Sequence, residues 1–169
     1  MIAKYRGLSL DEGTENKWIY GNLILDGQEA FIVNGVIESN EQYISIAEWY
    51  PVDIKTVGQF TGLIDEEGNE VYGGDVLGYT YQNDDYLMSL IEKYNVEPDA
   101  EGVYHIPEDI DENLIELTGY YEVIFEGTIP YARSNKKDRL TEDDILRSIE
   151  GFKVMGNVYQ HEHLLANTK

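Results

Sequence analysis

The 169-residue sequence contains no cysteine and only three histidines. It can therefore form no disulfide, zinc–thiolate site or thiol nucleophile. Its apolar runs fall short of the roughly 18 residues that a membrane-spanning helix needs. Residues 1–10 lack the apolar run and cleavage site of a signal peptide. We therefore expect a soluble cytoplasmic protein.

Positive charge is scarce as well. The chain has 12 Lys and Arg residues against 33 Asp and Glu, which gives a formal net charge of −21. Between Thr80 and Glu126 there are thirteen acidic residues and one basic residue, Lys93. Such a field repels nucleic acids and anionic membranes, because phosphate binding depends on cations. We expect the partner to be another protein or a further copy of the chain, and we expect neither direct nucleic-acid nor membrane binding.

What the sequence does contain favours β-structure. Apolar residues make up 42% of the chain, and there are 14 tyrosines, which favour strands. Short apolar runs recur about every ten residues, with turn signals at Asp26-Gly27 and Asn34-Gly35. The pattern predicts an α+β, mainly β fold: a small, strongly bent antiparallel sheet or an SH3-like barrel, with peripheral helices.

Composition changes over residues 80–118. Asp84 to Tyr94 is predicted to form an amphipathic helix with Leu87, Leu90 and Ile91 on one face. We interpret 80–118 as an acidic helical insertion within a single domain that covers residues 1–169. A second helix is predicted from Thr141 to Ile149.

A basic cluster follows the insertion. Arg133, Lys136, Lys137 and Arg139 are predicted to lie in a loop, residues 133–139. They could contact nucleic acid, offset the acidic segment as a solvated loop, or dock against it. The strongly negative net charge favours the last two interpretations.

The stretch from Thr56 to Leu77 organises the chain. It reads as two short strands joined by the turn 65–69, followed by Gly73, Gly74 and Asp75 at a sharp bend. Asp75 could act as a catalytic carboxylate with Glu70, or could accept backbone N–H bonds and fix the bend. The second interpretation is favoured, because the sequence supplies neither a nucleophile nor a tuned base.

Neither the stretch from Thr56 to Leu77 nor the C-terminal residues match the spacing of a known metal- or cofactor-binding motif. The turn 65–69 does not have calcium-loop spacing, and the segments G-Q-F-T-G and G-G-D lack the lysine and the helix of a phosphate-binding loop. His161, Glu162 and His163 are poorly spaced for a metal in a polar tail. We predict no catalytic residue, metal or cofactor. The candidate partner or pocket surface comprises Gln59, Thr61, Tyr72 and Asp75.

Three motifs, in order, carry a family resemblance. The first is K-Y-R-G at Lys4–Gly7 with W-I-Y-G at Trp18–Gly21. The second is T-V-G-Q-F-T-G-L at Thr56–Leu63 with Y-G-G-D at Tyr72–Asp75. The third is K-V-M-G-N-V-Y at Lys153–Tyr159. In these motifs the chain resembles the YopX family of phage and prophage proteins. The resemblance implies a mainly β fold with peripheral helices and plausible oligomeric assembly, and it carries over no catalytic residue.

Three functions remain open. The leading one is a non-enzymatic phage or prophage accessory protein that binds another protein or itself. The second is an acidic mimic of nucleic acid that inhibits a host DNA-binding protein, suggested by the acidic segment. The third is a metal-dependent nuclease built on Asp75 and neighbouring acids.

Overall fold

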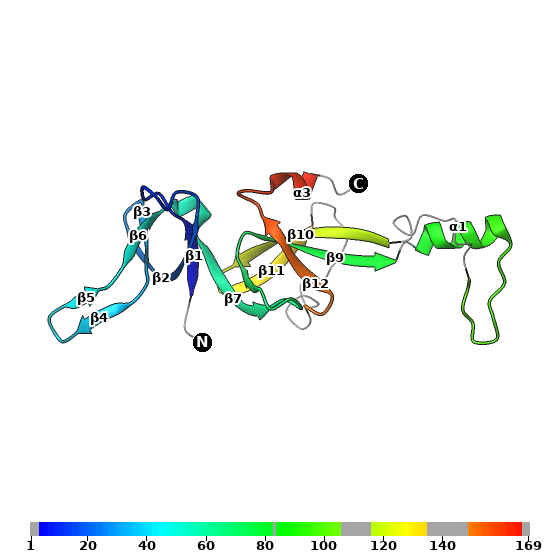
Figure 1. Ribbon diagram of the computed structural model, residues 1–169, viewed down its shortest axis with the longest axis horizontal. Helices are drawn as coiled ribbons and strands as arrows, with labels where there is room; N and C mark the ends of the chain where they lie inside the picture. Colours follow the sequence, from blue (N-terminus) through cyan, green and yellow to red (C-terminus); the bar gives the residue numbers. More distant parts are fainter. Residues whose placement is uncertain (1–3, 83, 106–115, 135–148, 167–169) are drawn as a thin grey trace.

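The computed structural model describes residues 4–82, 84–105, 116–134 and 149–166 (Figure 1). One sheet contains six strands: β1 (Tyr5–Leu8), β2 (Trp18–Asp26), β3 (Glu29–Val33), β6 (Trp49–Val52), β7 (Gly58–Ile64) and β8 (Glu70–Tyr72). A second contains four strands: β9 (Asp75–Gln82), β10 (Glu116–Glu126), β11 (Ile129–Ser134) and β12 (Phe152–Asn157). The third is the pair β4 (Val36–Ser39) and β5 (Ile44–Ile46). The helical elements are η1 (Ile54–Thr56), α1 (Asp84–Tyr94) and α3 (Glu162–Ala166).

The six-stranded sheet, in the order β6-β3-β2-β1-β7-β8, is strongly bent. Its outer strand β6 curls back until Ser9 and Val52 form an isolated bridge, and the Leu10 N–H donates to the Pro51 carbonyl at 2.9 Å. Ala30, Ile32 and Val52 are buried inside the curl. The contact between Ser9 and Val52 is an isolated bridge and not a paired strand, and the described strands form no closed barrel. The mainly β, bent-sheet prediction is confirmed, and the alternative of an SH3-like barrel is wrong.

Strands β3 and β6 continue beyond this sheet as a two-stranded arm, β4–β5, which projects at the end of the molecule away from α1 (Figure 1). The Asn34 N–H donates to the Glu48 carbonyl at 2.9 Å, and the Ala47 N–H donates to the Gly35 carbonyl at 3.1 Å. The predicted hairpin turn at Asn34-Gly35 is therefore wrong. Gly35, at φ +110°, bends one long hairpin instead of reversing the chain.

The second sheet has the order β11-β10-β9-β12, and its core lies against the β7–β8 hairpin. Val71 of β8 is buried with Leu77, Val123 and Phe152 of the second sheet, and Leu63 of β7 packs against this cluster. The alternation of apolar and polar residues along β10 and β12 accounts for this one-sided burial. The two sheets consequently share a core at the β7–β8 hairpin.

The helix predicted at Asp84–Tyr94 is confirmed as α1, with Leu90 as its buried residue. Strands β9 and β10 pair as far as Gln82 opposite Glu116, beyond the predicted strand limits. The connection between them is thus shorter than the proposed insertion 80–118, and its residues 106–115 lie outside the described ranges.

The C-terminal part differs from the prediction in two places. Residues from Glu162 to Ala166 form α3, so the polar tail expected there is wrong. Arg133 lies in β11, where it pairs with Glu122 at 2.6 Å, and not in a loop. The rest of the basic cluster and nearly all of the helix predicted at 141–149 lie outside the described residues.

Asp65, in the turn between β7 and β8, ties that hairpin to β12. Its carboxylate accepts four hydrogen bonds: from the Glu67 N–H at 3.0 Å, the Asn69 N–H at 2.7 Å, the Asn69 side-chain amide at 3.0 Å and the Val154 N–H at 2.9 Å. Burial alone would raise the pKa of Asp65, but these hydrogen bonds outweigh it and hold the pKa below its ordinary value.

We predict that Asp65→Asn lowers the free energy of unfolding at pH 7 by about 1–3 kcal/mol. Each carboxylate oxygen of Asp65 accepts hydrogen bonds from two donors. The side-chain amide nitrogen of asparagine is itself a donor, so it would face two donors in either orientation. A carboxyl group whose pKa is depressed by folding contributes stability above its unfolded pKa and loses it as the pH falls through the folded pKa. Urea denaturation measures the free energy of unfolding of both proteins. The difference in this free energy between wild type and Asp65→Asn should therefore shrink as the pH falls below 3.8, the ordinary pKa of an aspartate.

The matched control is Asp26→Asn, at the exposed end of β2. It should leave the unfolding free energy within about 0.5 kcal/mol of wild type. A constant difference between wild type and Asp65→Asn across the acidic range would contradict this assignment of the carboxylate.

Candidate functional site

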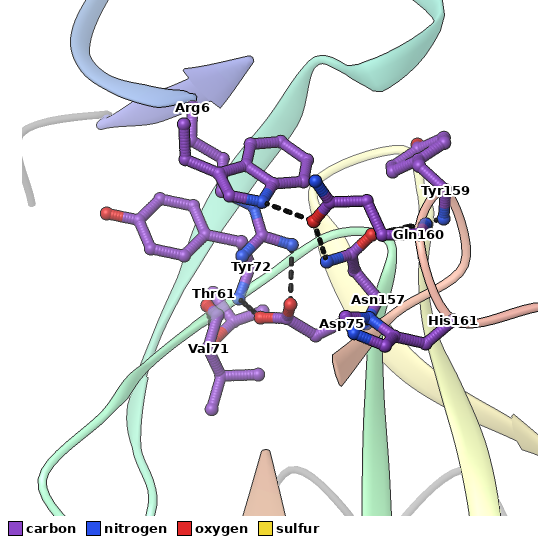
Figure 2. Close-up of polar contacts among 10 residues, drawn as sticks. Arg6, Thr61, Val71, Tyr72, Asp75, Asn157, Tyr159, Gln160 and His161 are labelled. Atoms are coloured by element: carbon purple, nitrogen blue, oxygen red, sulfur yellow. Dashed lines mark hydrogen bonds and ion pairs between the residues drawn. The ribbon is translucent and has the colours of Figure 1, made fainter. Parts of the chain in front are cut away.

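A buried ion pair joins the two sheets at the bend of the organising stretch. The Arg6 guanidinium of β1 donates to the Asp75 carboxylate of β9 at 2.5 Å, and their side chains are only 7% and 1% exposed (Figure 2). The second oxygen of Asp75 accepts the Tyr72 N–H at 2.8 Å. The guanidinium also lies 4.3 Å from the Trp18 ring and 4.9 Å from the Tyr72 ring. Burial raises the pKa of Asp75, while Arg6 and the Tyr72 N–H oppose this rise.

A second, half-exposed pair flanks the first. Tyr72 donates its hydroxyl to Glu70 at 2.6 Å, and Lys4 donates to the same carboxylate oxygen at 2.5 Å. The hydrogen bonds from Lys4 and Tyr72 lower the pKa of Glu70. Burial and the neighbouring Glu70 raise the pKa of Tyr72, so the phenol stays protonated and serves as a donor.

The segment after β12 covers the bend. Gly74, at φ +82°, lies so close to the Tyr159 ring that a Cβ atom there would come within 2.8 Å of it. The Gln160 side chain accepts hydrogen bonds from the Trp18 indole at 3.1 Å and from the Asn157 amide at 3.1 Å (Figure 2). These contacts join β2, the β8–β9 bend and the C-terminal segment.

The four candidate residues do not share one surface. Asp75 is buried in the ion pair, and the Thr61 hydroxyl donates to the Val71 carbonyl at 2.8 Å, so both side chains bind within the protein. Gln59 is half-buried in β7, and its carbonyl accepts the Gly73 N–H at 2.9 Å. Tyr72 lines a pocket.

That pocket is polar and has a volume of about 500 Å³. Its lining residues are Arg6, Tyr20, Gly68, Asn69, Glu70, Tyr72, Val154, Met155 and Gly156. Both charged side chains in its wall are paired, Arg6 with Asp75 and Glu70 with Lys4. The charged side chains of the pocket are therefore both engaged in ion pairs.

The acidic residues do not gather into a metal site in the described part of the chain, where no group of three or more His, Asp or Glu side chains could hold an ion. The Asp75 carboxylate is engaged by Arg6 and by the Tyr72 N–H. A nuclease built on Asp75 would need that carboxylate to leave both partners. Neither described helix has the length and apolar character needed to cross a bilayer.

A different surface, the arm and the groove at its base, exposes apolar side chains. The arm presents Val36, Ile37, Tyr43 and Ile44, of which Ile37 is 70% and Ile44 65% exposed. The groove, of about 260 Å³, is lined by Ile24, Phe31, Val33, Ile46 and Trp49. Large exposed apolar patches mark interaction sites. We call the arm and groove together the arm surface.

Sequence reasoning missed both Arg6 and the arm surface. Arg6 is a cation inside an otherwise uncharged strand of a chain with few cations, which is a usable signal for a buried pair. The strand E-A-F-I-V of β3 is apolar at four consecutive positions. This pattern signals a strand covered on both faces, and only one of those faces lies inside the curl.

Comparison with known proteins decides the family. The family model described as YopX protein matches residues 4–166. The chain belongs to the YopX family. No curated protein sequence matches it. Among solved structures, it is similar to the crystal structure of protein EF1440 from Enterococcus faecalis, with a TM-score of 0.53 and 17% identity over 98% of this chain and 99% of that one. At this identity the likeness concerns the fold alone.

The motifs on which the YopX resemblance rests meet at the ion pair. Arg6 and Trp18 come from the first motif, Tyr72 and Asp75 from the second, and Tyr159 from the third. The motif residues of this YopX protein therefore build a structural junction between its two sheets.

We predict that Asp75→Ala lowers the unfolding free energy by about 3–5 kcal/mol, because it leaves the Arg6 guanidinium buried without its counter-charge. The double variant Arg6→Met with Asp75→Ala should lose less stability than the sum of the single variants Arg6→Met and Asp75→Ala, since it removes both charges together. Chemical denaturation of the four proteins measures the coupling. Additive losses would show that the two charges do not act as a pair.

Proposed function

We propose that this YopX protein is a non-enzymatic, phage- or prophage-encoded accessory protein that binds another protein or a second copy of itself through the arm surface. The observation that carries the proposal is the projecting apolar arm beside an apolar groove. Soluble monomers rarely expose contiguous apolar patches of more than a few hundred Å² unless the patch binds something.

The composition of the arm surface also supports protein binding. Trp49 is 58% exposed and packs edge-on against Phe31, with ring centroids 5.4 Å apart. Tyr43, 51% exposed, lies between β4 and β5, close to the tip of the arm. Aromatic residues such as these dominate the binding energy of protein interfaces. The outer edges of β4 and β5 pair with no further strand in the described ranges, so the arm also offers backbone groups for strand addition.

The polar pocket supports an enzyme less well than the arm surface supports binding. Its charged side chains, Arg6 and Glu70, are already paired with Asp75 and Lys4. Catalysis requires a group able to exchange a proton or attack a substrate, and such a group has to be free to act.

The test compares an arm variant with a control variant. We predict that Ile37→Ser with Ile44→Ser keeps the fold, because both side chains are exposed, and weakens partner capture or self-association at least tenfold. Native mass spectrometry measures self-association, and quantitative affinity capture measures partner binding. Circular dichroism checks the fold.

The control is Met88→Ser with Ile129→Ser, which alters side chains that are 54% and 44% exposed outside the arm surface. This control should bind as wild type does. A monomer that captures no partner, or capture equally strong in the arm variant, would overturn the proposed function.

A further inference from the structure

Strand β3 is apolar on both faces, and one of these faces is only partly covered, with Phe31 half-buried and Val33 buried. Ala30 and Ile32 point into the buried curl. Phe31 and Val33, at the alternate positions, line the groove with Ile24 and Trp49. Ile24 and Trp49 are 44% and 58% exposed, so the groove is open along their side. A strand with this pattern is normally covered on both sides.

The charged residues of the strands and turns that form the groove and arm are all acidic, and we call them the acidic rim. The sequence contains no Lys or Arg from Trp18 to Ile54, whereas it contains acidic residues at Asp26, Glu29, Glu38, Glu41, Glu48 and Asp53. Glu38 and Glu41 lie on the arm, and Glu29 and Glu48 lie in or beside the strands that form the groove. In the part of the chain that the structure describes, none of these four carboxylates forms an ion pair within the protein.

This rim selects the occupant by charge. A second copy of the chain would bring the same carboxylates to the interface, and like charges facing one another oppose association. Anionic lipid and nucleic acid are repelled in the same way. A segment that carries Lys or Arg beside apolar residues would satisfy both features of the surface.

We propose that the arm surface binds an extended segment of another protein whose apolar side chains enter the groove and whose flanking Lys or Arg residues pair with the acidic rim. The unpaired edges of β4 and β5 accommodate such a segment as an added strand. This inference rests on the proposed function and specifies its partner.

The probe is the synthetic peptide Lys-Lys-Val-Thr-Ile-Tyr-Val-Lys-Lys, labelled for fluorescence anisotropy, with a matched peptide in which every lysine is replaced by glutamate. The full chain should bind the lysine peptide at least tenfold more tightly than the glutamate peptide. Its affinity should fall as salt is raised, because the rim is exposed to solvent. Trp49→Ser should weaken binding about thirtyfold, as loss of an interface tryptophan does.

Charge reversal at the rim separates this inference from the function on which it rests. Glu38→Lys with Glu41→Lys should weaken the lysine peptide about tenfold and strengthen the glutamate peptide, since the charges on the arm change sign. The control Glu12→Lys with Glu15→Lys, in the exposed loop before β2, should change neither affinity.

Two results would overturn the basic partner: equal binding of the two peptides, or binding that Glu38→Lys with Glu41→Lys leaves unaffected. The proposed function would still stand in either case if Trp49→Ser weakens binding. Dimerisation that the arm variant Ile37→Ser with Ile44→Ser abolishes would likewise replace the basic partner by a second copy. Binding that Trp49→Ser leaves unchanged would overturn both.

Discussion

The buried pair of Arg6 and Asp75 is the interaction on which the arrangement of the two sheets depends. Arg6 belongs to β1 of the six-stranded sheet, and Asp75 begins β9 of the four-stranded sheet. The bend before Asp75 is formed by Gly73 and Gly74, and the Asp75 carboxylate accepts the Tyr72 N–H across it. A buried charge is tolerated only when it is paired and hydrogen-bonded, so the pair fixes the position of β1 relative to the bend.

Much of this fold could be predicted from local pattern. Alternation and turn residues indicated the strands, and the spacing of Leu87, Leu90 and Ile91 indicated α1. The role of Asp75 as the residue that fixes the bend was also predictable, because an aspartate after two glycines has backbone donors within reach. These features depend on neighbours in sequence, which the sequence shows directly.

The features that could not be predicted depend on distant pairing. Nothing local to Asn34-Gly35 distinguishes a hairpin turn from a bend in a long hairpin, since the difference is whether β3 pairs with β4 or with β6. The partner of Asp75 lies 69 residues away, and the sequence does not show which cation reaches it. The candidate set of Gln59, Thr61, Tyr72 and Asp75 came from one stretch of chain, whereas the arm surface combines side chains from β2 to β6.

The link from Trp18 to Gln160 spans 142 residues, and this separation has a consequence for folding. The indole and the Tyr159 ring that covers Gly74 can be brought together only after nearly the whole chain has been synthesised. Contacts between such distant residues carry a large loop-closure cost and slow the search for the native state. The covering of the β8–β9 bend by the C-terminal segment is accordingly expected to form later in folding than contacts between neighbours in sequence.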